Sequence, residues 1–174
     1  SYLLKSSESF IAGIKAGLIS GWEKYGVLPS VSAAQAILES GWGSSGLAIY
    51  GNNLFGIKGT YNGAYVTMPT QEYINGQWIT IDAQFRKYPS WNESVEDHGY
   101  FLASNSRYSN LLGVTDYKKV TSLLQQDGYA TAPTYASALN TIIEQNNLTA
   151  IDDEAINNLK VDKGDLNETT ISGG

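Results

Sequence analysis

An Asn-Gly pair at residues 75 and 76 places the strongest limit on how this chain can fold. Asn-Gly favours the positive φ angles of a two-residue hairpin turn, and alternating apolar residues flank it on both sides. We therefore expect an antiparallel hairpin of Ala64–Ile74 and Gln77–Tyr88. With this pair as the loop, Glu72 faces Ile79 and shares a mostly apolar strand face, because side chains alternate. A slip of one residue would move Glu72 to the more polar face.

The rest of the chain has the periodicity of helices. Ser90 opens one of them with the capping-box sequence Ser-Trp-Asn-Glu. Thr115 is expected to cap a later helix and Gly128 to end it. The fold class predicted is α+β, with a mostly helical body and a small antiparallel hairpin lobe. The expected helices are residues 7–24, 30–39, 90–103, 117–126 and 133–146.

The composition excludes several classes of protein. The 174 residues carry a net charge of −6 and a scattered set of eleven Lys and Arg, so nucleic acid is not an expected partner. There is no Cys and only one His, too few for a zinc site of these ligands. No apolar run approaches the roughly 18 residues of a membrane span.

The helical pattern fades after about Thr149. We expect residues 1–149 to form one domain and residues 150–174 to be an acidic linker or disordered tail. Because the chain begins at Ser1 without Met, we also expect a processed protein or a domain cut from a longer one.

Glu39 is the one acidic residue of the segment Pro29–Gly43, and it ends an otherwise apolar and small-residue helix. A negative charge there opposes the helix dipole, at a cost of about 0.3–1 kcal/mol, and no nearby residue compensates. Partial desolvation raises a carboxyl pKa, which suits a general acid that protonates a leaving oxygen. Glu39 is therefore the candidate catalytic acid.

A second acid is available on the hairpin. A helical body with one hairpin lobe offers a cleft between them, with Glu39 on the body and Glu72 on the hairpin. Two carboxylates across a groove are the arrangement for glycoside hydrolysis. One acid protonates the glycosidic oxygen, and the other activates water, attacks or holds the substrate.

Aromatic residues with a polar edge are abundant, with 12 Tyr and 4 Trp against 4 Phe. Such side chains suit sugar binding because they combine a flat apolar face with a hydrogen-bonding group. Of the candidates, Trp42 and Phe55 fit the cleft floor as well as a sugar contact, and His98 is expected to be structural. The candidate substrate-binding residues are Trp42, Asn53, Phe55, Tyr73, Trp78 and Tyr100.

Five segments occur in order along the chain: SVSAAQAILESGWG (Ser30–Gly43), NNLFGIKG (Asn52–Gly59), the hairpin with Glu72, SVEDHGYFL (Ser94–Leu102) and GYATAPTYASAL (Gly128–Leu139). Together they resemble glycoside hydrolase family 73, the bacterial and phage peptidoglycan N-acetylglucosaminidases, over about residues 5–148. The resemblance implies a lysozyme-like fold, Glu39 as general acid, Glu72 as the second acid of some members, and Tyr129 as a tyrosine near the reacting sugar. Ala132 departs from the pattern where Asp is common, which touches no catalytic position.

The resemblance also implies a function. The chain is expected to be an endo-β-N-acetylglucosaminidase that cleaves the β-1,4 bond between N-acetylglucosamine and N-acetylmuramic acid in peptidoglycan, leaving N-acetylglucosamine at the reducing end. It implies no metal and no organic cofactor. The expected setting is the catalytic domain of a secreted Gram-positive autolysin in the cell wall, monomeric, with peptidoglycan glycan strands as partner, no membrane partner, and further cell-wall-binding modules.

Two mechanisms and several alternatives stay open. In the first mechanism, Glu72 activates water and the anomeric centre inverts. In the second, the substrate's 2-acetamido group attacks the anomeric carbon while Tyr129 and Glu72 stabilise or orient that group. A muramidase or lytic transglycosylase on the same scaffold is the alternative enzyme. A wall-binding module without catalysis is the alternative from another class.

Overall fold

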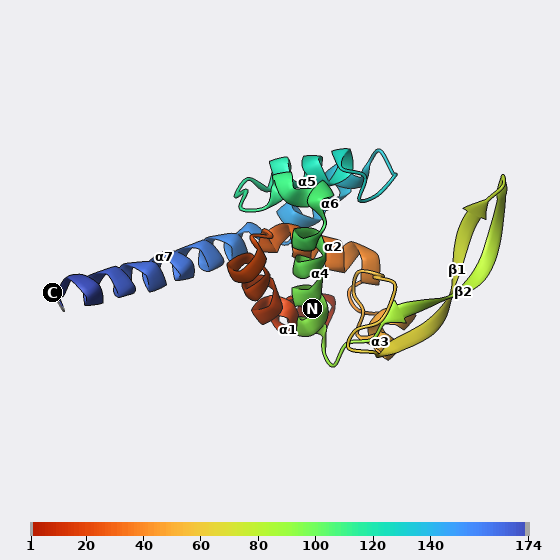
Figure 1. Ribbon diagram of the computed structural model, residues 1–174, viewed down its shortest axis with the longest axis horizontal. Helices are drawn as coiled ribbons and strands as arrows, with labels where there is room; N and C mark the ends of the chain where they lie inside the picture. Colours follow the sequence, from red (N-terminus) through yellow and green to blue (C-terminus); the bar gives the residue numbers. More distant parts are fainter. Residues whose placement is uncertain (1, 173–174) are drawn as a thin grey trace. The chain divides into compact units, whose positions relative to one another are not determined.

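The computed structural model describes residues 2–172, with side chains described for residues 6–162. It confirms the α+β fold, because helices dominate and one two-stranded antiparallel sheet is present in the described chain (Figure 1). In chain order the elements are α1 Tyr2–Tyr25, α2 Pro29–Ser40, α3 Gly46–Gly51, β1 Tyr65–Ile74, β2 Gln77–Arg86, α4 Trp91–Ser104, the 3-10 helix η1 Ser106–Leu111, α5 Tyr117–Gln126, α6 Tyr135–Gln145 and α7 Thr149–Ser172.

The chain divides into two compact units. The hairpin unit comprises residues up to Gly17 together with Gln35–His98, and the helical unit comprises Leu18–Ala34 together with the residues from Gly99 onward. Helices α1, α2 and α4 each contribute residues to both units.

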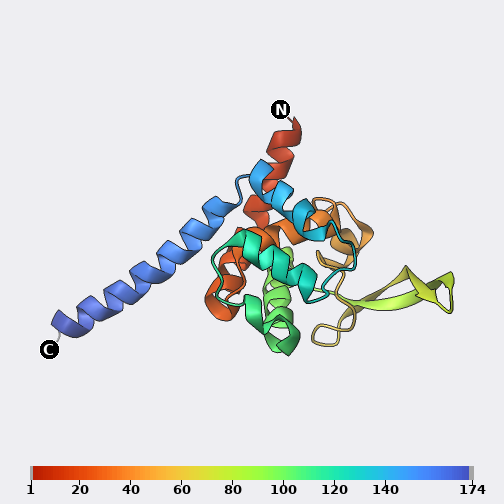
Figure 2. The ribbon, with the colours of Figure 1, turned by 90° about the horizontal axis from the view of Figure 1, so that it is seen from above.

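The hairpin has the predicted register. Ile74 pairs with Gln77 and Glu72 with Ile79, with Asn75 and Gly76 both at positive φ in the turn. The face that carries Glu72 is half-buried near the base of the hairpin, where Phe85 is 6% exposed. Toward the turn this face is open, since Ile74, Ile79 and Ile81 are 39–44% exposed. The ribbon shows why: the hairpin extends away from the rest of its unit (Figures 1 and 2).

A second Asn-Gly turn precedes the hairpin and was not predicted. Asn62 and Gly63 both have positive φ, and Tyr61 and Ala64 exchange backbone hydrogen bonds of 2.9 and 2.8 Å across them. The short helix α3 was also not predicted. Ser45 caps it by accepting from the Ala48 N–H.

In the helical unit α5 packs against both α6 and η1, and α5 and α6 lie side by side (Figure 1). Leu124, Leu139 and Ile143 are fully buried, as the helical period requires. One detail differs from expectation. Asp116, not Thr115, caps α5: it directly precedes the first helical residue, Tyr117, and accepts from the Lys118 N–H at 3.1 Å. Tyr100 on α4 is 53% exposed.

The segment expected to be an acidic linker or disordered tail, residues 150–174, begins as a helix. Helix α7 begins at Thr149, and Ile151, Asp152 and Ala155 in its first turns are buried. The reason is a contact 122 residues away in sequence: Asp152 Oδ1 accepts from the Ser30 N–H at 2.7 Å, at the start of α2. Asp152 is therefore a helix cap rather than a solvated acid. Whether later residues act as a linker stays a prediction.

None of the helices in the described range has the length and apolar character needed to cross a membrane.

Candidate active site

Glu39 is the penultimate residue of α2, and the chain turns sharply just after this helix. Gly41, Trp42 and Gly43 all have positive φ, of 56°, 60° and 81°. The Ser40 hydroxyl stabilises this turn by donating to the Ala36 carbonyl at 2.6 Å and accepting from the Gly43 N–H at 2.8 Å. Trp42 is unusual, because a bulky residue rarely adopts the left-handed conformation.

Close packing explains the glycine at residue 43. A Cβ there would lie 2.6 Å from the Trp91 ring and 3.0 Å from Phe10. Phe10 in turn contacts both tryptophans, with ring centroids 5.8 Å from Trp42 and 5.2 Å from Trp91. Trp42 is thus part of an aromatic cluster below the turn and supports the end of α2.

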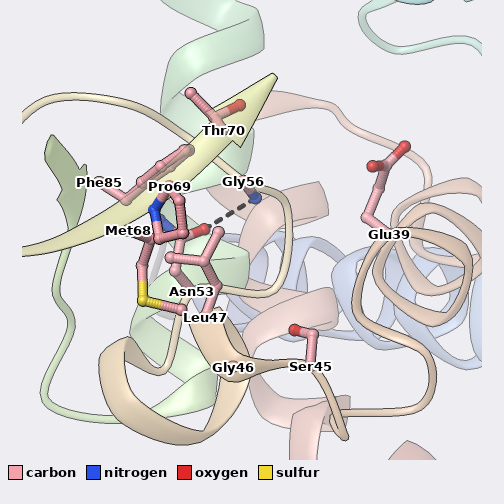
Figure 3. A pocket seen from close by; sticks show the side chains of 10 residues that line it. All are labelled: Glu39, Ser45, Gly46, Leu47, Asn53, Gly56, Met68, Pro69, Thr70 and Phe85. Carbon is pink, nitrogen blue, oxygen red and sulfur yellow. Dashed lines mark hydrogen bonds between the residues drawn. The ribbon is translucent and has the colours of Figure 1, made fainter. Parts of the chain in front are cut away.

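A pocket of about 360 Å³ lies beside this helix end. Figure 3 shows Glu39 at the end of α2 on one side and residues of β1 on the other. Gly46 allows α3 to approach β1, since a Cβ would lie 2.7 Å from Met68 Cε. The lining residues are Glu39, Ser45, Gly46, Leu47, Asn53, Gly56, Met68, Pro69, Thr70 and Phe85, all in the hairpin unit.

The pKa of the Glu39 carboxyl is raised above its usual value because part of the side chain is removed from water. Glu39 is nevertheless exposed as a residue, so solvent and ligands reach it. Among the described residues no Lys or Arg forms an ion pair with it. A carboxyl that is accessible, unpaired and partly desolvated can hold its proton closer to neutral pH than an ordinary glutamate.

Glu72 has an ion-pair partner that the sequence did not indicate. Its Oε1 lies 2.5 Å from Lys58 Nζ, and both side chains are partly exposed. Lys58 is held against β2 by a bridge with Phe85. Glu72 itself does not line the pocket, but Thr70, two positions along the same strand face, does. The hairpin therefore brings the face of Glu72 to the pocket that holds Glu39.

Asn53 lines the pocket but uses its amide within the protein. Its Nδ2 donates to the Ile57 and Arg86 carbonyls, both at 2.9 Å, and its Oδ1 accepts from the Gly56 N–H at 2.9 Å (Figure 3). Asn53 is 1% exposed. In this structure it shapes the pocket wall by holding the loop from residue 53 to residue 57.

Phe55 and His98 form a buried stack, with ring centroids 3.9 Å apart and planes 10° from parallel. Burial lowers the pKa of His98 to about 3, so its imidazole is neutral at physiological pH. This agrees with the structural role expected for His98. Phe55, at 6% exposed, packs beneath the loop.

Tyr73 and Trp78 lie on the other face of the hairpin. They pair directly across the strands, with ring centroids 5.2 Å apart, and are 62% and 69% exposed. Because Glu72 is the neighbour of Tyr73 on one strand, this aromatic pair points away from the Glu72 face. If this aromatic pair binds sugar, it does so outside the Glu39 pocket, on the opposite face of the hairpin.

The two other candidates belong to the helical unit. The Tyr129 ring packs against Tyr108 and Tyr135, with centroids 6.0 and 5.9 Å apart. Tyr100 contacts Tyr25 edge to face.

A family model named Glucosaminidase, described as mannosyl-glycoprotein endo-beta-N-acetylglucosaminidase, matches residues 16–148. The chain belongs to the glucosaminidase family. This membership makes it a glycoside hydrolase by family and accords with the resemblance to glycoside hydrolase family 73.

Several curated bacterial proteins are similar to this chain in sequence. Exo-glucosaminidase LytG of Bacillus subtilis is 45% identical over 137 residues, 76% of this chain and 49% of that protein. A Lactococcus lactis subsp. cremoris protein named "Probable N-acetylmuramidase" is 46% identical over 156 residues, 84% of this chain and 35% of that protein. The chain thus spans half or less of the curated relatives that it matches.

A solved autolysin catalytic domain has a similar fold. The catalytic domain of the autolysin Auto from Listeria monocytogenes is 44% identical, with a TM-score of 0.77 over 84% of this chain and 87% of that one. This structural match supports the α+β fold class expected from the sequence.

Proposed function

We propose that this chain hydrolyses the β-1,4 bond between N-acetylglucosamine and N-acetylmuramic acid in peptidoglycan, with Glu39 as the general acid. The observation that carries the proposal is the state of Glu39: an accessible carboxyl in a pocket, without a cationic partner among the described residues and with a raised pKa. The glucosaminidase family membership supports cleavage after N-acetylglucosamine, and relatives named as an autolysin and as peptidoglycan hydrolases support peptidoglycan as the substrate.

In the proposed reaction the protonated Glu39 carboxyl donates its proton to the glycosidic oxygen as the bond to the anomeric carbon breaks. The leaving sugar departs as a neutral alcohol, and Glu39 becomes a carboxylate. Desolvation favours this role because it raises the population of the protonated acid at neutral pH.

Two routes for the other half of the reaction remain proposals. On the inverting route, Glu72 takes a proton from water that attacks the anomeric carbon, with carboxyls roughly 6.5–9.5 Å apart in the working enzyme. Lys58 would then orient the Glu72 carboxylate through their ion pair. On the substrate-assisted route, the 2-acetamido oxygen attacks, while Glu72 and Tyr129 stabilise or orient that group.

The Glu39→Gln variant tests the acid role. It keeps the size of the side chain but cannot donate a carboxyl proton, so we expect lysis of purified cell walls to fall by at least about 100-fold. Glu23→Gln, which neutralises an exposed acid on α1, is the matched control and should lyse at the wild-type rate. A Glu39→Gln variant that retained about a tenth of the activity would lose only about 1.4 kcal/mol of barrier reduction and would contradict the assignment.

A muramidase is the second candidate, because one relative of 46% identity carries that name. The two candidates differ in which sugar bears the new reducing end, so the products distinguish them.

We further propose that the chain acts in the cell wall, outside the cell, as a monomeric catalytic domain beside wall-binding modules. The support is that the Enterococcus faecalis autolysin is much longer than the region that it shares with this chain, which covers 18% of that protein.

A further inference from the structure

A second pocket, of about 280 Å³, lies in the hairpin unit and shares no lining residue with the Glu39 pocket. It is formed where the Asn62-Gly63 turn meets the chain that leaves β2. The lining residues are Tyr61, Asn62, Ala64, Lys87, Tyr88 and Pro89.

This second pocket is built on a fixed framework. The Tyr61–Ala64 hydrogen bonds close the turn, and the Lys87 N–H donates to the Ala64 carbonyl at 3.2 Å. The Tyr61 and Tyr88 rings pack 4.8 Å apart. Buried Tyr88 donates its hydroxyl to Asp97 Oδ2 at 2.5 Å, and Arg86 donates to the same oxygen at 2.8 Å. The pocket therefore needs little reorganisation to accept a ligand.

The chemistry of the pocket combines apolar surface with one positive charge. Two tyrosine rings, Ala64 and Pro89 provide the apolar wall, and Lys87 is the charged residue among the six. Within the described residues no carboxylate pairs with Lys87, whereas Lys58 and Arg86 on the same unit both have acidic partners. An unpaired cation beside apolar rings suits a small ligand with a methyl group and a carboxylate.

We propose that this pocket binds the free carboxylate end of a peptidoglycan stem peptide, with alanyl methyl groups against Tyr61 and Tyr88 and the carboxylate toward Lys87. The choice of peptide rests on the proposed function, which makes peptidoglycan the substrate. In a peptide-bearing strand the lactyl carboxyl of muramic acid is consumed in an amide bond, so free carboxylates belong to the peptide. The Asn62 side chain, exposed at the pocket rim, offers an amide partner for the peptide backbone.

The probe is N,N′-diacetyl-lysyl-D-alanyl-D-alanine, titrated into the ¹⁵N-labelled wild-type chain and followed by NMR. We expect saturable shifts at Tyr61, Asn62, Lys87 and Tyr88. The same peptide with a C-terminal amide should bind at least 5-fold more weakly. Lys87→Gln should weaken binding to a similar extent, whereas Lys119→Gln, an exposed lysine on α5, should not.

Several outcomes would overturn this site. These are no shifts at the four residues, equal binding of acid and amide, unchanged binding in Lys87→Gln, or binding of N-acetylmuramic acid but not of the peptide. Because the probe contains no glycosidic bond, the result does not depend on Glu39. A wild-type chain that binds the peptide but gives the wrong glycan products would refute the proposed function and leave this site standing.

Discussion

Glu39 is placed where a carboxylate is least favourable for the fold. It lies at the C-terminal end of α2, where negative charge opposes the helix dipole, and desolvation raises its pKa. Trp42, three residues on, adopts a left-handed conformation that also costs free energy. Unfavourable choices that cluster at one helix end are expected where function, rather than stability, selects the residues.

The first prediction concerns the stability of Glu39→Gln. A carboxyl whose pKa is higher in the folded than in the unfolded state binds its proton more tightly in the folded protein. Its ionisation therefore lowers the free energy of unfolding as the pH rises from the unfolded-state pKa to the folded-state pKa. We therefore expect Glu39→Gln to melt at or above the wild-type temperature at pH 7, with the gain shrinking toward pH 4. Thermal melts at both pH values, with Glu23→Gln as control, provide the test. A clear loss of stability at pH 7 would mean that the carboxylate supports the fold.

The second prediction separates the roles of Lys58 and Glu72. Their ion pair is exposed on both sides, so Lys58→Ala should lower the free energy of unfolding by less than about 1 kcal/mol. Glu72→Gln should leave stability similarly unchanged. If Glu72 is the base, the variant should lose about 10²–10⁴ in kcat, and on the substrate-assisted route the loss should be only moderate. Wild-type kcat in Glu72→Gln would exclude Glu72 from both routes.

At the scale of elements, local signals determined what the sequence could predict. The Asn75-Gly76 turn and strand alternation gave the register of the hairpin residue by residue, and apolar periodicity gave α2 and α5. The second Asn-Gly turn carried the same signal at residues 62 and 63, but a long strand, β1, flanks it only on its C-terminal side. Helix α3 has only six residues, too few for a periodic pattern.

The third prediction tests the contact between α7 and α2. Burial raises the pKa of Asp152 to about 6, so ionisation of this group costs stability as pH rises from about 4 to 6, and the cost is complete above that range. Asp152→Asn keeps the acceptor for the Ser30 N–H without the charge. We expect this variant to be more stable than wild type at pH 7.5, by on the order of 1–3 kcal/mol, and to match it near pH 4.

Asp152→Ala is the companion variant. It removes the acceptor and should cost about 0.5–2 kcal/mol at pH 4, as expected for a lost helix cap. Urea unfolding at both pH values measures the series. Equal stability of the Asn and Ala variants would show that the hydrogen bond contributes nothing.

At the scale of the whole molecule, the fourth prediction is that the folded domain continues past residue 149. A chain that ends at Thr149 lacks Ile151, Asp152 and Ala155, all buried. Loss of the isoleucine alone removes about 1.5–3 kcal/mol. We expect this shortened chain to unfold at lower urea than one that ends at Lys160. If the two chains unfold at the same urea concentration, the folded domain ends at residue 149, as the sequence pattern predicted.

The candidate site was predictable only in part, because sequence patterns report local features and not contacts between distant segments. Glu39 stood out because its unfavourable position is local to one helix. Lys58 as the partner of Glu72 and Asp152 as the cap of α2 depend on tertiary contacts, separated by 14 and 122 residues. Asn53 and Phe55 lie at the pocket or beneath its loop, yet the folded chain uses their polar and aromatic surfaces internally.

The most direct test of the central claim is the identity of the sugar at the new reducing ends. Purified peptidoglycan is digested with the chain, the products are reduced with borohydride, and mass spectrometry identifies the reduced residue, with Glu39→Gln as the blank. We predict reduced N-acetylglucosamine, absent from the blank. Reduced N-acetylmuramic acid, or its 1,6-anhydro form, would contradict the proposed glucosaminidase activity.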